Sequence, residues 1–242
     1  MSLGQTERKE RTMIAENPSA RDRIMDMAKR YLSGAREGIH VSSLIYPLKH
    51  YYRVRHPDVA LSDRLVGLFI AGRGHHSVIQ MLAALPQYRE VRVEWMGIRG
   101  TIDIFEDRVV EIKTTRVQTP LTPERVAREH REWIDQIRYY CAMVGSGRAQ
   151  LWVFYLGLRD GSGRLTPHLQ VFDVDAGDLE AARAEMLGRK QVLERALSSG
   201  DPSLLPRCPD WMCRECEFGG ICIASPAKAQ EAGRDVELEP LE

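Results

Sequence analysis

The clearest structural signal in the sequence is the stretch GTIDIFEDRVVEIKTT, residues 100–115, which is typical of two strands joined by a short charged turn. Three charged residues, Asp103, Glu111 and Lys113, stand among its Ile and Val residues. Side chains alternate between the two faces of a strand, so Glu111 and Lys113 project to the same side. The stretch therefore predicts a hairpin that carries charge where apolar residues would be expected.

The length of the turn sets which residues face each other across the hairpin. If the turn is Glu106-Asp107-Arg108, Phe105 pairs with Val109, and Asp103 then lies directly across from Glu111. A two-residue turn would misalign the two acids unless a bulge corrected the register. The first alternative predicts two facing carboxylates.

Facing carboxylates about 5 Å apart at the backbone repel each other unless a positive charge lies between them. Divalent cations that prefer oxygen ligands fill such a gap, and a neighbouring lysine can hold a water or stabilise developing negative charge. This set of groups suits metal-assisted hydrolysis of a phosphodiester. For the Glu-x-Lys pattern taken alone, an ordinary ion pair on a strand face is the simpler interpretation.

Composition limits the class of protein. The chain has 242 residues, 43% hydrophobic and 28% charged, with a formal net charge of zero and a pI of about 7.1. These values are typical of a globular protein with one domain or a domain and an appendage.

Because the net charge is zero, nucleic-acid binding would need a local basic patch. No apolar run is long enough to span a bilayer and the N-terminus lacks a signal-peptide core, so we expect a cytoplasmic protein without membrane partners.

The order of elements indicates a mixed α/β domain with a central sheet. Helical segments are expected over 17–32, 40–54 (broken by Pro47), 61–85, 122–145 and 178–200, and strands over 89–96, 100–106, 109–115, 148–157 and 167–174. In the first helix Ser19 is a candidate cap, and Ile24, Met27 and Tyr31 form one stripe. Gly72 and Gly74 indicate a bend or a close approach within the third segment. The predicted divisions are a flexible N-terminus (1–16), a core (17–200), a cysteine module (201–225) and a disordered acidic tail (226–242).

Two further residue pairs lie on helices beside the hairpin. Gly72 and His76 precede it, and Gln136 and Tyr140 follow it at a spacing that places both on one helical face. Taken singly, His76 could be a hydrogen-bonded core histidine and Tyr140 a packing residue. His75 is a rival to His76.

In this order, the four pairs resemble the motifs of the RecB-like branch of the PD-(D/E)xK nuclease superfamily, over about residues 40–222. The resemblance implies a restriction-endonuclease-like core, with a central mixed sheet flanked by helices. It implies that His76, Asp103, Glu111 and the Ile112 carbonyl bind Mn²⁺ or Mg²⁺. The implied catalytic residues are Asp103, Glu111, Lys113, Gln136 and Tyr140. In this resemblance Lys113 serves the nucleophilic water, and Gln136 and Tyr140 orient Lys113 and contact the nucleic-acid backbone.

Four of the five cysteines form a compact set near the C-terminus, Cys208, Cys213, Cys216 and Cys222. Four cysteines within fifteen residues of a cytoplasmic chain indicate a metal site, and zinc is the default interpretation. The last three resemble the iron–sulfur module of RecB-like nucleases, most closely the CRISPR-associated exonuclease of the Cas four type. The resemblance implies an iron–sulfur cluster, [4Fe–4S] in preference to [2Fe–2S], with Zn²⁺ as the alternative.

The chain departs from that pattern at Tyr46, which stands where the family has a fourth cysteine at the start of a Cys-Pro-Arg-Lys-x-Tyr-Tyr segment. Cys208 is the expected replacement, and a cluster held only by the C-terminal segment would stabilise a local lobe. Cys141 is expected to be a core residue.

The segment from Lys49 to His56 interleaves basic residues with tyrosines, a pattern that suits a single-stranded nucleic acid. The candidate nucleic-acid-binding residues are Lys49, Tyr51, Tyr52, Arg53 and Arg73. A surface helix with packed tyrosines explains the same pattern.

The sequence thus predicts a metal-dependent DNA exonuclease that acts on single-stranded ends. By resemblance its context could be CRISPR spacer acquisition, with the integrase complex as a partner. A DNA-binding subunit of weak activity and a zinc-stabilised scaffold are the alternatives.

Overall fold

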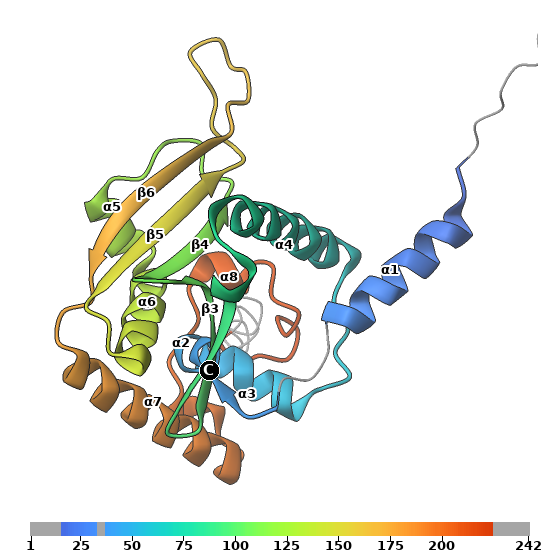
Figure 1. Cartoon of the computed structure of the whole chain (residues 1–242). Coiled ribbons are helices and arrows are strands. Elements are labelled where there is room, and N and C mark those ends of the chain that lie inside the picture. Colours follow the sequence, from blue (N-terminus) through green and yellow to red (C-terminus); the bar gives the residue numbers. More distant parts are fainter. Residues whose placement is uncertain (1–15, 33–36, 225–242) are drawn as a thin grey trace, which may run out of the picture.

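The computed structural model describes residues 16–32 and 37–224 (Figure 1). The predicted loose N-terminus, except Glu16, and the predicted acidic tail lie outside these residues. None of the helices in the described ranges has the length and apolar character needed to cross a bilayer. In chain order the elements are α1 (Pro18–Leu32), β1 (Ile39–His40), α2 (Val41–Ile45), α3 (Pro47–Arg55), α4 (Asp63–Ala83), η1 (Pro86–Tyr88), β2 (Arg89–Trp95), β3 (Ile98–Phe105), β4 (Val109–Thr115), α5 (Pro123–Glu129), α6 (Arg131–Val144), β5 (Arg148–Tyr155), β6 (His168–Asp175), α7 (Leu179–Ser199), η2 (Pro202–Leu204) and α8 (Asp210–Cys213).

The chain is an α/β protein with a mixed six-stranded sheet flanked by helices. The strands follow the order β1-β3-β4-β5-β6, and β2 pairs with β3 outside this path. The β1–β3 and β4–β5 pairs are parallel, whereas β2–β3, β3–β4 and β5–β6 are antiparallel. The predicted α/β class with a central mixed sheet is confirmed.

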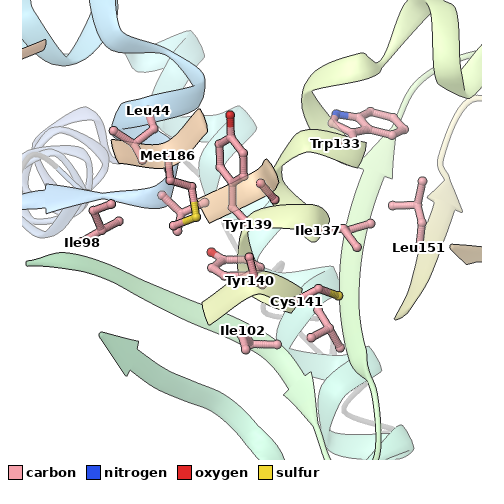
Figure 2. Packing of buried hydrophobic residues seen from close by; sticks show 14 of the residues in the cluster. Leu44, Ile98, Ile102, Trp133, Ile137, Tyr139, Tyr140, Cys141, Leu151 and Met186 are labelled. Atoms are coloured by element: carbon pink, nitrogen blue, oxygen red, sulfur yellow. The ribbon is translucent and has the colours of Figure 1, made fainter. Parts of the chain in front are cut away.

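Helices cover both faces of β4 and β5. On one face, α6 packs against the sheet and α7 packs against α6; Figure 2 shows their buried side chains meeting those of α2, β3 and β5. On the other face, Ile79 of α4 packs against Val110 and Ile112. Burial on both sides explains why β4 lacks the alternation of a half-exposed strand.

The first helix packs differently from the sequence prediction. Ile24, Met27 and Tyr31 are exposed, and the side that packs on Leu61, Leu65 and Val66 carries Met25, Ala28 and Leu32. Arg21 and Lys29 also form salt bridges to Asp63 at the start of α4. The cap is Asn17, whose side chain accepts a hydrogen bond from Ala20 N–H at 3.0 Å; Ser19 lies inside the helix.

Two helix predictions also require correction. The expected single helix over 122–145 is divided at His130, whose backbone leaves helical geometry (φ −134°, ψ 40°). The His130 ring stacks on that of Trp133, with 3.9 Å between the ring centroids. By contrast, α4 runs uninterrupted through Gly72 and Gly74. A Cβ built on either glycine would have no neighbour within 4 Å, so no close approach requires a glycine there.

Candidate active site

The strands β3 and β4 diverge shortly after their turn. Their only Cα-paired residues in the described chain are Phe105 with Val109 and Ile104 with Val110, which confirms the predicted three-residue turn. Asp103 and Glu111 would be the next pair in this register, but the ladder stops before them. Instead, the Asp103 carboxylate accepts a hydrogen bond from the backbone N–H of Ile112 at 2.7 Å. The predicted acid pair therefore stands where the two strands separate.

Glu111 is buried at this fork, with 3% of its surface exposed. One carboxylate oxygen, Oε1, accepts a hydrogen bond from Lys113 Nζ at 2.6 Å. The other, Oε2, is buried without a hydrogen-bond partner in the described structure. An unpartnered buried carboxylate oxygen is costly, so the fork holds an acceptor that a cation could satisfy.

A chain of hydrogen bonds runs from Lys113 to α6. Lys113 Nζ donates to Gln136 Oε1 at 2.9 Å, and Gln136 Nε2 donates to the hydroxyl of Tyr140 at 3.3 Å. The two α6 residues are one turn apart on the same helical face, as the sequence predicted. The ammonium group thus has a fixed position, and its third N–H can donate to a water or a phosphate oxygen.

Gly100 gives Tyr140 the space that it needs. A Cβ at position 100 would lie 2.6 Å from Tyr140 Cε1 and 3.2 Å from Val93 Cγ2. Only glycine lets the tyrosine ring approach the β3 backbone this closely. The contact joins the glycine of the hairpin motif to the tyrosine of the α6 motif.

Burial raises the pKa values of both acids. Asp103 has a pKa of about 6 because desolvation outweighs the Ile112 N–H and the Lys113 charge. Glu111 has a pKa of about 7 because desolvation, with the nearby Asp103 charge, outweighs the attraction of Lys113. Buried carboxyl groups with raised pKa values are typical of sites that bind a cation or transfer protons.

The two histidines of α4 differ in position. His76 Nδ1 lies 3.9 Å from Asp103 Oδ2, whereas His75 Nδ1 bonds the Ala71 carbonyl at 2.6 Å and its ring packs on Phe154. Burial, followed by the Lys113 charge, lowers the pKa of His76 and favours its neutral, metal-binding form. Of the two histidines, His76 is therefore the one that lies beside the acids.

Two residues near the acids were not predicted. Gln80 is 4% exposed, and its Nε2 donates to the Asp103 carbonyl at 3.2 Å and to Glu90 Oε1 at 2.8 Å. Glu90 adopts φ +49°, which is unusual for a residue other than glycine. Gln80 follows His76 by four residues, so helical spacing could have identified it.

All four clustered cysteines line one small cavity, together with Leu48, Lys49, Tyr52, Phe218 and Gly219. Burial raises the pKa of the Cys208 thiol to about 11 and also raises those of Cys213 and Cys216. Across residues 16–32 and 37–224, no three or more His, Cys, Asp or Glu side chains are arranged so that they could hold a metal ion. The cysteines share a cavity but are not arranged as a ligand shell.

The cysteine segment packs against α3, so the expected local lobe is wrong. The hydroxyl of Tyr52 accepts a hydrogen bond from Ile223 N–H at 2.9 Å, and the Tyr52 ring stacks on Phe218. Lys49 Nζ lies 2.9 Å from a carboxylate oxygen of Glu217. Protein contacts alone therefore connect this segment to the N-terminal part of the fold.

The candidate nucleic-acid residues fall into two groups. Tyr51 and Tyr52 are 6% and 4% exposed, and the Tyr51 hydroxyl donates to the Gly200 carbonyl at 2.6 Å, so neither ring is available for a base. This corrects the stacking role predicted for them. Lys49 is largely buried against Glu217. Arg53 and Arg73 remain solvent-accessible.

Comparisons with known proteins bear on the fold. No protein-family model matches the sequence, and no curated protein matches it. The solved structure titled "Crystal structure of SSO0001" superposes with a TM-score of 0.55 at 17% identity, covering 86% of this chain and 97% of that one. A phage-related exonuclease from Haemophilus somnus 129PT gives a TM-score of 0.38 at 16% identity, covering 76% of this chain and 84% of that one. This structural similarity is too low to show a shared fold. The first likeness shows a shared fold.

Proposed function

We propose that this chain is a divalent-metal-dependent DNA exonuclease with a RecB-like PD-(D/E)xK core. The observation that carries the proposal is the buried Glu111, whose Oε2 has no partner in the described structure and which stands beside Asp103 at the strand fork. Burial of two acids there raises the cost of leaving them charged. A structural role alone would be served better by apolar residues.

The residue types suit Mn²⁺ or Mg²⁺, but in the part of the chain that the structure describes His76, Asp103 and Glu111 are not arranged as a ligand shell, so side-chain rotation must bring them together. Carboxylate oxygens and a neutral imidazole are suitable ligands for these ions, and Glu111 Oε2 is an acceptor without a partner in the described chain. Asp103, Glu111 and His76 would hold the ion, with the Ile112 carbonyl as a predicted fourth ligand. The ion would neutralise charge on the phosphate and favour ionisation of a water.

The protein's own groups supply the remaining requirements. Lys113, held by Glu111 and Gln136, can orient a water towards phosphorus and stabilise the negative charge that develops on the phosphate oxygens. Tyr140 fixes Gln136 and through it the ammonium group. The proton of the attacking water passes to a nearby carboxylate or to solvent, and the leaving oxygen carries away the bonding pair.

For the cysteine segment we propose an iron–sulfur cluster held by Cys208, Cys213, Cys216 and Cys222, with Zn²⁺ as the alternative. Support comes from four thiols lining one cavity. A bound metal would deprotonate thiols whose pKa values burial raises. Side-chain rotation must bring the sulfur atoms together. Visible absorption separates the alternatives, because iron–sulfur proteins are brown and zinc proteins are colourless.

A DNA-binding subunit with little activity is the second candidate. It is favoured by one observation, the 2.6 Å pair between Lys113 and Glu111, because this pair occupies one of the two Glu111 carboxylate oxygens. In this reading the acids and lysine stabilise each other and bind no ion.

The test is cleavage of single-stranded DNA, labelled at either end, in Mn²⁺, Mg²⁺ or EDTA. The proposal predicts metal-dependent release of nucleotides from one end, lost in His76→Ala and retained in His75→Ala. No cleavage by a folded, metal-loaded protein would favour the DNA-binding subunit, and equal loss in both histidine variants would contradict the ligand assignment.

A further inference from the structure

A second cavity, of about 230 Å³, lies between α3, α4 and the cysteine segment. Its lining includes Arg53 and His56 at the end of α3, Phe69 and Arg73 on α4, and Phe218 from the cysteine segment. Sites that enclose a whole small molecule are usually larger, about 300–1,000 Å³. The cavity therefore suits one group of a longer ligand whose remainder lies outside.

The lining combines exposed guanidinium groups with rings, aliphatic groups and the buried Glu217 carboxylate. Arg53 and Arg73 are exposed, whereas Leu61 and Phe218 are buried. Phe69, at 36% exposure, presents part of its ring on the α4 side. Guanidinium groups match phosphates and aromatic rings stack with bases, so the lining matches a nucleotide.

The arginines can engage a phosphate at little cost. Arg53 lies 3.3 Å from Glu217, but Lys49 approaches the same carboxylate at 2.9 Å and would keep it paired. Arg73 rests over the ring of Tyr31, with its guanidinium carbon 5.6 Å from the ring centroid. Tyr31 is itself 75% exposed, so solvent can replace that contact.

The cavity is adjacent to the candidate active site. Arg73 precedes His76 by three residues on α4, a spacing that places the two side chains about 5–6 Å apart at Cβ. His76 in turn lies beside Asp103. A strand whose phosphate reaches the acids would therefore present a neighbouring nucleotide to the cavity.

We propose that this cavity binds one nucleotide of the substrate strand, with its base against Phe69 and its phosphate on Arg53 and Arg73. The proposal rests on the proposed nuclease function, because it takes single-stranded DNA as the ligand. It gives Phe69 a role that no sequence motif indicated.

The test is binding of a fluorescent single-stranded deoxythymidine oligomer by the full chain in EDTA, which prevents cleavage. One base at a time is removed along the oligomer. A stacked base predicts one position where its removal weakens binding about 5- to 100-fold. Phe69→Ala should weaken binding of the intact oligomer and abolish that position's effect, and Phe69→Tyr should restore both.

Matched variants control for folding and charge. Ile70→Ala, at a neighbouring residue with 50% exposure outside the cavity lining, should bind like the wild type. Arg73→Gln should reduce the magnitude of the slope of log affinity against log salt concentration by about one. Arg23→Gln, at an exposed residue outside the lining, should leave this slope unchanged.

The failures of the two proposals are distinguishable. Equal binding at every abasic position, or a position effect that survives Phe69→Ala, would overturn the cavity assignment even if metal-dependent cleavage occurs. Competition by a free deoxynucleoside monophosphate as strong as that by the oligomer would also overturn it. A position effect without cleavage in Mn²⁺ would support the cavity assignment and contradict the nuclease.

Discussion

Glu111 and Asp103 carry the chemical argument at the scale of single residues. Both are buried, and both have raised pKa values, about 7 and about 6. In an unfolded chain these groups would ionise near pH 4. The native protein therefore binds more protons than the unfolded one between about pH 4 and 7.

This difference predicts how stability depends on pH. Without metal, the melting temperature of the wild type should fall relative to that of Glu111→Gln as pH rises from 5 to 8, because the stabilisation from the protonated Glu111 is lost through its native pKa. On the proposed function Mn²⁺ would bind the ionised carboxylates, so it should raise the melting temperature more at pH 8 than at pH 5. Differential scanning calorimetry of the wild type and Glu111→Gln tests this. A metal-free melting temperature that rises over this range, identically in both proteins, would contradict the burial argument.

A second residue-scale prediction compares two motif glycines. Gly100→Ala should lower the free energy of unfolding by about 1–3 kcal/mol, because its Cβ would overlap the ring of Tyr140. Gly72→Ala has open space on a helix and should raise it by about 0.5–1 kcal/mol. Urea unfolding measures both. Equal effects of the two substitutions would refute the assignment of Gly100 to close packing.

At the scale of elements, α4 and β3 are connected by Gln80. Its amide donates to the Asp103 carbonyl and to Glu90, so it links the helix that carries His76 to the strand that carries Asp103. Gln80→Leu removes the donor to the half-buried Asp103 carbonyl and should cost about 1–3 kcal/mol of unfolding free energy. It should also weaken Mn²⁺ binding, measured by calorimetric titration. Gln87→Leu, at an exposed position, serves as the control and should change stability by less than about 0.5 kcal/mol.

The elements also show what could be predicted from sequence. Alternation along residues 100–115 and the turn after Phe105 led to the correct hairpin register, because local sterics dominate there. The division of α5 from α6 at His130 depends on stacking against Trp133, which helical periodicity does not reveal. The packing side of α1 depends on contacts with Leu61, Leu65 and Val66, which are distant in sequence.

For the candidate site, the motif residues Lys113, Gln136 and Tyr140 lie together in the structure. Helical spacing alone predicted that Gln136 and Tyr140 share a face, whereas the contact between Gln136 and Lys113 was implied only by the family resemblance. Burial of Tyr51 and Tyr52 could not be foreseen, because a tyrosine among basic residues suits a surface and a core equally well. Their partners, Gly200 and Ile223, lie about 150 residues or more away.

At the scale of the whole molecule, the cysteine segment and α3 form one packed unit through Tyr52, Phe218 and Ile223. Loss of the proposed cluster should therefore loosen α3 as well as the cysteines. Cys213→Ala should lose bound iron or zinc, lower the melting temperature and speed hydrogen exchange at the Ile223 amide. Cys141→Ala, in the core away from the cluster cavity, should keep its metal. Full stability of a metal-free Cys213→Ala protein would argue against a structural cluster.

The most direct test of the central claim is the single-turnover rate at which the protein cleaves end-labelled single-stranded DNA in Mn²⁺. The variants are Glu111→Gln and Lys113→Ala, with Glu94→Gln as an exposed acidic control on β2. If Glu111 holds the metal and Lys113 stabilises the transition state, the rates of Glu111→Gln and Lys113→Ala should be at least about 100-fold lower than that of the wild type. The rate of Glu94→Gln should be unchanged. Rates within a few-fold of wild type in folded Glu111→Gln and Lys113→Ala proteins would show that the fork is not the active site.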